Sequence, residues 1–178
     1  MYVIYLPGNS IRNKEWIEKI KANFDSFSKG EIVYYDHWEK GEENIYFEKE
    51  LEKLTKMGKE KDNYVLFAKS VGVILALKAV ADKIIKPQKV IFCGFPCSFV
   101  AGNNFSVDVG KALSKLSTPT VFVQNEFDKV GGEKEVKKVL KKFKPKKYSI
   151  VTNPGIYTHD YENYPQLTKL AREFFEKG

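Results

Sequence analysis

The chain has 178 residues, of which 43% are hydrophobic, enough to bury a core of its own as a single domain over residues 1–178. Its net charge of +7 comes almost wholly from lysine. Only Arg12 and Arg172 supply the planar forks that favour phosphate and base contacts, which argues against nucleic-acid binding. No apolar run approaches the roughly 18 residues of a membrane-spanning helix. The opening M-Y-V-I-Y-L-P-G looks like a strand and turn, so we expect a cytoplasmic protein without membrane contact.

Strand and helix patterns alternate along the whole chain. Continuous apolar runs, typical of strands covered on both faces, predict strands at 2–6, 31–35, 63–68, 89–93, 119–124 and 146–151. Apolar residues at helical spacing predict helices at 13–27, 43–58, 71–85, 106–116, 132–143 and 164–177. This order predicts an α/β fold: a three-layer α/β/α sandwich around a mostly parallel sheet of about six strands. Ligands of such sheets bind beyond the carboxyl ends of the strands.

Two features of composition carry no function in this interpretation. The lysine-rich run K-K-V-L-K-K-F-K-P-K-K at 137–147 has apolar residues at helical spacing, so its lysines are predicted to be the solvated face of a helix. Cys93 and Cys97 are the only cysteines, and we expect reduced thiols, because zinc sites usually need four ligands.

A serine stands where the third predicted strand meets the following helix, in N-Y-V-L-F-A-K-S-V-G at 63–72. A serine on such a corner is a nucleophile elbow: the turn lifts the hydroxyl above the sheet, and the helix start directs N–H groups at a developing oxyanion. The motif G-x-S-x-G needs small residues two before and two after Ser70, and Ala68 and Gly72 meet this need, with alanine replacing the first glycine. Serine is also a good helix N-cap, which remains an alternative for Ser70.

The pair Lys69-Ser70 also invites comparison with a phosphate-binding loop, G-x-x-x-x-G-K-[ST]. That motif requires glycine at positions 63 and 68, where this chain has Asn63 and Ala68. A nucleotide site is therefore not expected.

A serine nucleophile needs a base and an acid, and in a hydrolase sheet the order is nucleophile, acid, histidine. Of the two histidines, His159 follows the last predicted strand and fits this order, whereas His37 precedes the serine and is predicted to be a loop residue that could line the site. The acid should follow the strand 119–124, where Asp128 is our choice and Glu126 the second. Asp160 is expected to be solvated.

An oxyanion hole needs two N–H donors. One is the amide of Val71, which follows the serine, and the other usually comes from the turn after an early strand. Here the first strand runs into P-G-N-S, so the amide of Asn9 is the candidate, although P-G is also an ordinary turn.

The segments P-G-N-S, A-K-S-V-G, N-E-F-D and T-H-D-Y on this pattern resemble the α/β-hydrolase family, especially the compact enzymes of the retinoblastoma-binding protein 9 type. The resemblance covers the whole chain. It implies a minimal sheet that lacks the family's first two antiparallel strands. It also implies Ser70 as nucleophile, His159 as base, Asp128 as its orienting acid, and the amides of Asn9 and Val71 as oxyanion donors.

The loop after residue 93 has about a dozen residues, too short for a cap domain, so we expect an open site. Trp38, Phe95, Phe99 and Tyr157 are candidates for lining it, or are simply packing aromatics. Lys69 has two interpretations. It could favour an anionic substrate, or its side chain could point to solvent, which is the interpretation we prefer.

These observations predict a serine esterase that cleaves a small acyl substrate through an acyl-enzyme, without metal or cofactor. Whether the bond is an ester or an amide stays open, and the sequence does not indicate an oligomeric state. The alternative is a non-catalytic module of the same fold that binds an acidic partner through its lysine-rich surface.

Overall fold

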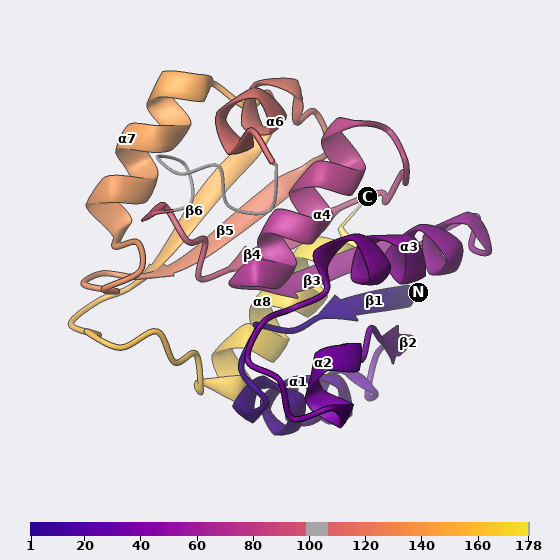
Figure 1. Cartoon of the computed structure of the whole chain (residues 1–178). Helices are drawn as coiled ribbons and strands as arrows, with labels where there is room; N and C mark the ends of the chain where they lie inside the picture. The colour runs from indigo at the N-terminus through magenta and orange to yellow at the C-terminus, as the bar shows by residue number, and fades with distance from the viewer. Residues whose placement is uncertain (99–106, 178) are drawn as a thin grey trace.

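The computed structural model describes residues 1–98 and 107–177. Its strands form one parallel sheet in the order β2-β1-β3-β4-β5-β6 (Figure 1). The strands are β1 (Tyr2–Leu6), β2 (Lys29–Ile32), β3 (Val65–Lys69), β4 (Val90–Cys93), β5 (Thr120–Asn125) and β6 (Tyr148–Asn153).

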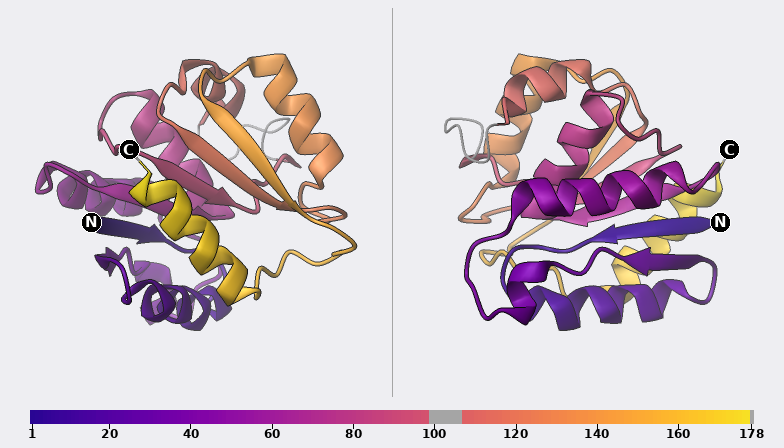
Figure 2. Two further views of the ribbon diagram at one scale, coloured as in Figure 1. Left: turned by 180° about the vertical axis from the view of Figure 1, so that it is seen from behind. Right: turned by 45° about the vertical axis from the view of Figure 1, so that its right-hand side comes forward.

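Helices cover both faces of the sheet, so the predicted three-layer α/β/α arrangement is confirmed. Helices α3 and α4 lie in front of the sheet in Figure 1, while the view from behind in Figure 2 shows α1 and α8 on the opposite face. The helices are α1 (Arg12–Phe24), α2 (Asp36–Glu39), α3 (Phe47–Lys59), α4 (Val71–Ala81), α6 (Val109–Lys115), α7 (Glu133–Phe143) and α8 (Tyr164–Glu176).

Two hydrophobic layers hold the helices against the sheet. One lies under α3, α4, α6 and α7. The other lies under α1 and α8, which pack against each other. Because β3, β4 and β5 are covered from both sides, every one of their residues is buried, whereas the edge strands β2 and β6 are partly exposed. This is the burial expected of a doubly covered parallel sheet.

The register of the strands brings their carboxyl ends to one edge. Leu6 pairs with Ala68, and Lys69 pairs with Cys93. The loops that follow β1, β3 and β4 therefore start beside one another, and the loop after β5 starts next to that after β4. Candidate residues that are far apart in the sequence share this edge.

The second strand differs from its prediction at 31–35. It spans Lys29–Ile32, because Gly30 has no side chain and lets its backbone lie against the carbonyl of Val3, where a Cβ would clash. Val33 and Tyr35 are buried but lie beyond the strand, and the chain then enters the short helix α2, which was not predicted. The other strands begin and end within two residues of their predicted bounds.

Two surface features complete the fold. In α7, Val136 and Leu140 are buried while the lysines of this helix are exposed, so the lysine-rich run is the solvated face that its spacing predicts. Within the described ranges, no helix combines the length and apolar character needed to cross a membrane.

Candidate active site

Ser70 occupies a strained corner between β3 and α4. Its φ of +53° and ψ of −118° lie in a region that side chains other than glycine rarely adopt. The backbone is held there because the N–H of Ser70 donates to the carbonyl of Cys93 at 3.1 Å and its carbonyl accepts from Val73 at 2.9 Å. The side chain makes no capping hydrogen bond to α4, so the N-cap alternative is not supported.

The small residues around Ser70 follow from close packing. A Cβ at Gly72 would lie 2.6 Å from the carbonyl oxygens of Leu6 and Pro7, so the first turn of α4 presses against the end of β1. Ala68 is fully buried in the core. The alanine variant of the elbow motif is therefore accommodated, and Gly72 is the position that no other residue fits.

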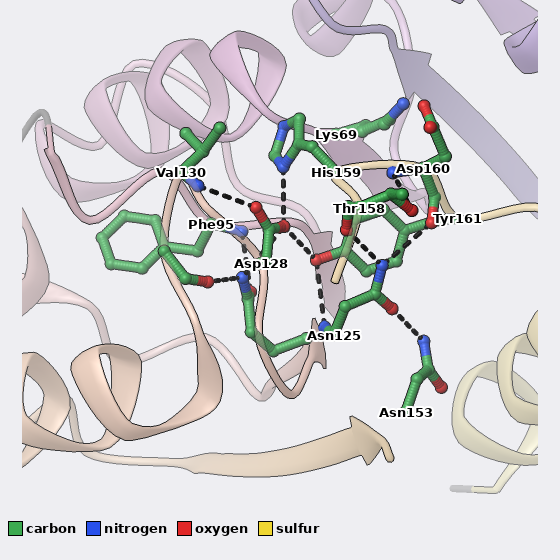
Figure 3. Close-up of polar contacts among 12 residues, drawn as sticks. Lys69, Phe95, Asn125, Asp128, Val130, Asn153, Thr158, His159, Asp160 and Tyr161 are labelled. Atoms are coloured by element: carbon green, nitrogen blue, oxygen red, sulfur yellow. Dashed lines mark hydrogen bonds and ion pairs between the residues drawn. The ribbon is translucent and has the colours of Figure 1, made fainter. Parts of the chain in front are cut away.

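His159 and Asp128, predicted as base and acid, lie in direct contact. Nδ1 of His159 is 2.7 Å from Oδ2 of Asp128, and the carboxyl is buried (Figure 3). A carboxylate only accepts hydrogen bonds, so Nδ1 carries the hydrogen and a neutral ring keeps its lone pair on Nε2. Nε2 is buried and has no hydrogen-bond partner among the described residues.

The ring of His159 lies against the backbone beside the serine. Gly94 has φ +63°, and a Cβ there would be 2.9 Å from Cε1 of His159. Gly94 directly follows Cys93, the residue whose carbonyl holds the N–H of Ser70. The structure thus brings the ends of β3, β4 and β5 and the loop after β6 to one place.

The environment keeps Asp128 ionised. Burial alone would raise the pKa of its carboxyl, but the hydrogen bond and charge of His159, with the N–H of Val130 and the phenol of Tyr161, hold that pKa below its usual value. An ionised Asp128 can hold the ring of His159 in one orientation and would stabilise an imidazolium if the ring accepted a proton.

The two candidate oxyanion donors lie on touching segments. Val71 is the first residue of α4, and the N–H groups of a first helical turn have no partner inside the helix. Asn9 lies in the turn after β1, the segment against which Gly72 packs. Neither amide donates a hydrogen bond within the described part of the chain.

The side chain of Lys69 is buried and does not point to solvent, so the expectation from the sequence was wrong. Its side chain is only 5% exposed, its Nζ donates to Oδ1 of Asn13 at 2.9 Å, and it lies 4.6 Å above the ring of Trp16. Alternation along β3 directs Lys69 to the face covered by α1, from which both partners come. Burial lowers the pKa of its ammonium group.

The aromatic candidates take different places. Phe95 is fully buried in the core and packs edge-on against Phe122, so it is a packing residue. Tyr157 is exposed and stacks on Phe127 at 4.5 Å. Trp38 borders the turn after β1, as described below, and Phe99 lies outside the described residues.

The remaining acids and histidine have other partners. Glu126, the second choice for the acid, accepts a hydrogen bond from the N–H of Gly155 at 2.9 Å. Asp160 is exposed, as expected. His37 does not line an open site but is buried, with its Nε2 2.9 Å from the carbonyl of Asn9.

Tyr161 and Asn125 were not singled out from the sequence. Tyr161 donates from its phenol to Asp128 at 2.8 Å and accepts from the N–H of Asn125 at 3.1 Å. The side-chain amide of Asn125 donates through Nδ2 to the carbonyls of Thr158 and Asp160, both at 2.9 Å. It therefore fixes the backbone on either side of His159 (Figure 3). The only sequence signal was an aromatic residue two positions after His159.

No described cluster of His, Cys, Asp and Glu side chains would hold a metal ion. A cavity of about 580 Å³ opens beside the turn after β1; its lining residues are Asn9, Ser10, Ile11, Trp38, Gly41, Glu42, Glu43 and Asn44. This volume suits a small organic group.

No known protein-family model matches the sequence, and no curated protein sequence does either. Solved structures do match. The chain is similar to Est1E from Butyrivibrio proteoclasticus with ferulic acid bound, at a TM-score of 0.73 and 16% identity over 98% of this chain and 87% of that one. It is also similar to MGS-M2, an alpha/beta hydrolase from a deep-sea metagenome, with a TM-score of 0.69 and 14% identity over 99% and 90% of the two chains.

The protein has the α/β-hydrolase fold. A cold-adapted esterase from an Arctic intertidal metagenomic library is a further neighbour, with a TM-score of 0.67 and 14% identity over 97% of this chain and 81% of that one. Along the chain, Ser70 directly follows β3, Asp128 lies in the loop after β5 and His159 lies in the loop after β6.

Proposed function

We propose that the chain is a serine hydrolase, folded as one catalytic domain, that cleaves a small ester through Ser70, His159 and Asp128. The observation that carries the proposal is the 2.7 Å contact between Nδ1 of His159 and Asp128, which leaves a buried Nε2 with no partner among the described residues. A histidine whose Nδ1 is held by a carboxylate and whose Nε2 has no partner has the arrangement of a general base.

In the first half of the reaction, Oγ of Ser70 attacks the ester carbonyl and Nε2 of His159 takes its proton. The negative charge that develops on the carbonyl oxygen is stabilised by the amides of Asn9 and Val71. His159 then gives the proton to the departing alkoxide, so the alcohol leaves and the acyl group stays on Ser70.

In the second half, water takes the place of the alcohol. His159 removes a proton from the water as it attacks the acyl carbon, and the same two amides hold the oxyanion. When the tetrahedral intermediate collapses, the proton returns to Oγ of Ser70 and the carboxylic acid is released. Every proton transfer is served by His159, so the mechanism requires neither metal nor cofactor.

The proposed substrate is a small ester. The structural neighbours include esterases, and one of them holds ferulic acid. The cavity of about 580 Å³ beside Asn9 is large enough for a modest acyl or alcohol group, with Ile11 and Trp38 as its apolar wall. A non-catalytic binding role has less support, because binding alone would not require the contact between His159 and the buried carboxyl of Asp128.

A fluorophosphonate probe tests the proposal. We expect one adduct, located on Ser70 by peptide mass spectrometry, and slow labelling in a His159→Gln variant that keeps a polar side chain of similar length. Hydrolysis of p-nitrophenyl acetate should fall by at least about 10⁴-fold in Ser70→Ala. Folded protein that labels nowhere, or a Ser70→Ala variant as active as the wild type, would overturn the proposal.

A further inference from the structure

Side chains from residues 35–38 hold the turn that carries the amide of Asn9. The phenol of Tyr35 donates to the carbonyl of Pro7 at 2.7 Å. His37 and Trp38 both hydrogen-bond the carbonyl of Asn9, through Nε2 at 2.9 Å and Nε1 at 2.7 Å. The described residues therefore direct three donors from one short segment at two carbonyls of the turn.

These contacts fix the peptide between them. The N–H of Asn9 belongs to the peptide that joins Gly8 to Asn9. The preceding peptide is held through the carbonyl of Pro7, and the following one through the carbonyl of Asn9. Since peptides are planar, holding both neighbours leaves the middle N–H little freedom to rotate. The side chain of Asn9 adds a bond of its own, from Nδ2 to the carbonyl of Glu43 at 2.7 Å.

The surroundings of His37 favour a fixed hydrogen bond to Asn9 over proton transfer. Its ring is 1% exposed and stacks on Tyr35 with the centroids 5.8 Å apart. A carbonyl oxygen only accepts, so Nε2 carries the hydrogen. Nδ1 is buried without a hydrogen-bond partner in the described ranges, so no described acid pairs with it.

We infer that His37 and Trp38 are positioning residues of the oxyanion hole. They hold the N–H of Asn9 at the place where the carbonyl oxygen of the substrate becomes charged. His37 does not line the cavity beside Asn9, and Trp38 borders it while its Nε1 bonds the carbonyl of Asn9. This inference rests on the proposed function. It gives the second histidine and the unpredicted helix α2 a part in the reaction.

The test compares a p-nitrophenyl ester with its thiono analogue, in which sulfur replaces the carbonyl oxygen. Sulfur is a weak hydrogen-bond acceptor, so the thionoester gains little from the oxyanion amides. His37→Phe keeps an aromatic ring but removes the N–H donor, and Trp38→Phe does the same at a half-buried position. In each variant we expect kcat for the oxygen ester to fall by about 10-fold, less than the 10²–10³-fold typical of deleting an oxyanion donor.

The expected pattern is specific to the oxyanion hole. KM should stay within about twofold, the thionoester rate should change little, and the oxygen-to-sulfur rate ratio should fall. His37→Gln, which restores an N–H donor, should recover part of the ratio. Tyr64→Phe is the control: it removes a buried phenol that accepts from the N–H of Lys86, far from the site, and should leave the ratio unchanged.

Two outcomes separate the possible failures. If folded His37→Phe and Trp38→Phe both keep the wild-type rate and ratio while Ser70→Ala is inactive, the positioning role is wrong and the proposed function stands. If Ser70→Ala hydrolyses both esters as the wild type does, the proposed function is wrong and the positioning role falls with it.

Discussion

Tyr161 and His159 donate to the same oxygen of Asp128, at 2.8 Å and 2.7 Å (Figure 3). Burial raises the pKa of the Tyr161 phenol, so it stays protonated and keeps donating. The phenol oxygen also accepts from the N–H of Asn125. One hydroxyl group thus links the proposed acid to the end of β5.

We expect Tyr161→Phe to lower both stability and turnover. The N–H of Asn125 would lose its acceptor in a buried place, which costs about 1–3 kcal/mol of unfolding free energy. Asp128 would lose one of the donors that fix it, and kcat should fall by on the order of 10-fold with little change in KM. Urea unfolding and ester kinetics measure the two effects.

Tyr157→Phe is the matched control for Tyr161→Phe. Its ring is exposed and stacked on Phe127, an arrangement that phenylalanine retains. Both stability and kcat should stay at the wild-type level. A Tyr161→Phe variant equally unchanged would mean that the hydrogen bond to Asp128 contributes to neither property.

The acid can be assigned by comparing Asp128→Asn with Glu126→Gln. An asparagine at 128 offers His159 an amide, which favours the wrong tautomer of the ring, and kcat should fall by about 10⁴-fold. Glutamine at 126 can still accept from the N–H of Gly155, so its kcat should stay within about threefold. The opposite ranking in ester kinetics would move the role of acid to Glu126.

The lowered pKa of Asp128 also predicts how stability depends on pH. Because the folded carboxyl has a pKa below its usual value, its contribution to stability is complete above that usual value and is lost as the pH falls through the folded pKa. The difference in unfolding free energy between wild type and Asp128→Asn should therefore be constant near neutral pH and shrink in acid. Denaturant titrations from pH 7 to about pH 2 measure this difference in unfolding free energy. If the difference grew in acid, the prediction would be wrong.

Sequence patterns predicted the parts of the site that follow strand ends. Ser70 and Asp128 follow strands whose residues are all buried, and His159 lies in the loop after the partly exposed edge strand β6. Ligands of parallel sheets bind beyond these carboxyl ends, so polar residues in the following loops were the natural candidates. Tyr161 was missed because a buried aromatic residue in a loop looks like any other core residue until its hydroxyl partner is known. The hydrogen bonds of His37 escaped notice for the same reason, since periodicity reports burial but not which carbonyl a side chain meets.

The burial of Lys69 could not be predicted from the pattern of its own strand. Its place in β3 fixes the face to which it points, but not what covers that face. The partners Asn13 and Trp16 come from α1, more than fifty residues earlier, and only their positions in three dimensions make a buried lysine tolerable.

We predict that the positive φ of Ser70 costs backbone strain, which the corner between β3 and α4 imposes. Ser70→Ala and Ser70→Gly both remove the hydroxyl, but only glycine adopts a φ of +53° without strain. We expect Ser70→Gly to be more stable than Ser70→Ala by about 1 kcal/mol, while both lack activity. Thermal unfolding of the pair isolates the backbone term, and equal stability of the two variants would show that the corner is relaxed.

Replacing the buried charge of Lys69 should stabilise the protein at neutral pH. Burial lowers the pKa of its ammonium group, so at pH 7 the folded state carries a desolvated charge that the unfolded state leaves in water. Lys69→Met keeps the length of the chain without the charge, and we expect a gain of about 1–3 kcal/mol, reduced by the lost contacts with Asn13 and Trp16.

The gain from Lys69→Met should depend on pH in one direction. Below the folded pKa of Lys69 both states hold the proton and the gain is constant. As the pH rises from there toward the usual lysine value, the folded state releases its proton first, so the wild type becomes more stable and the gain narrows. Lys138→Met, on the exposed face of α7, should change stability by less than about 0.5 kcal/mol at any pH. If denaturant unfolding from pH 6 to 10 gave a gain that widened with pH, the ammonium of Lys69 would be stabilised by its surroundings rather than desolvated by them.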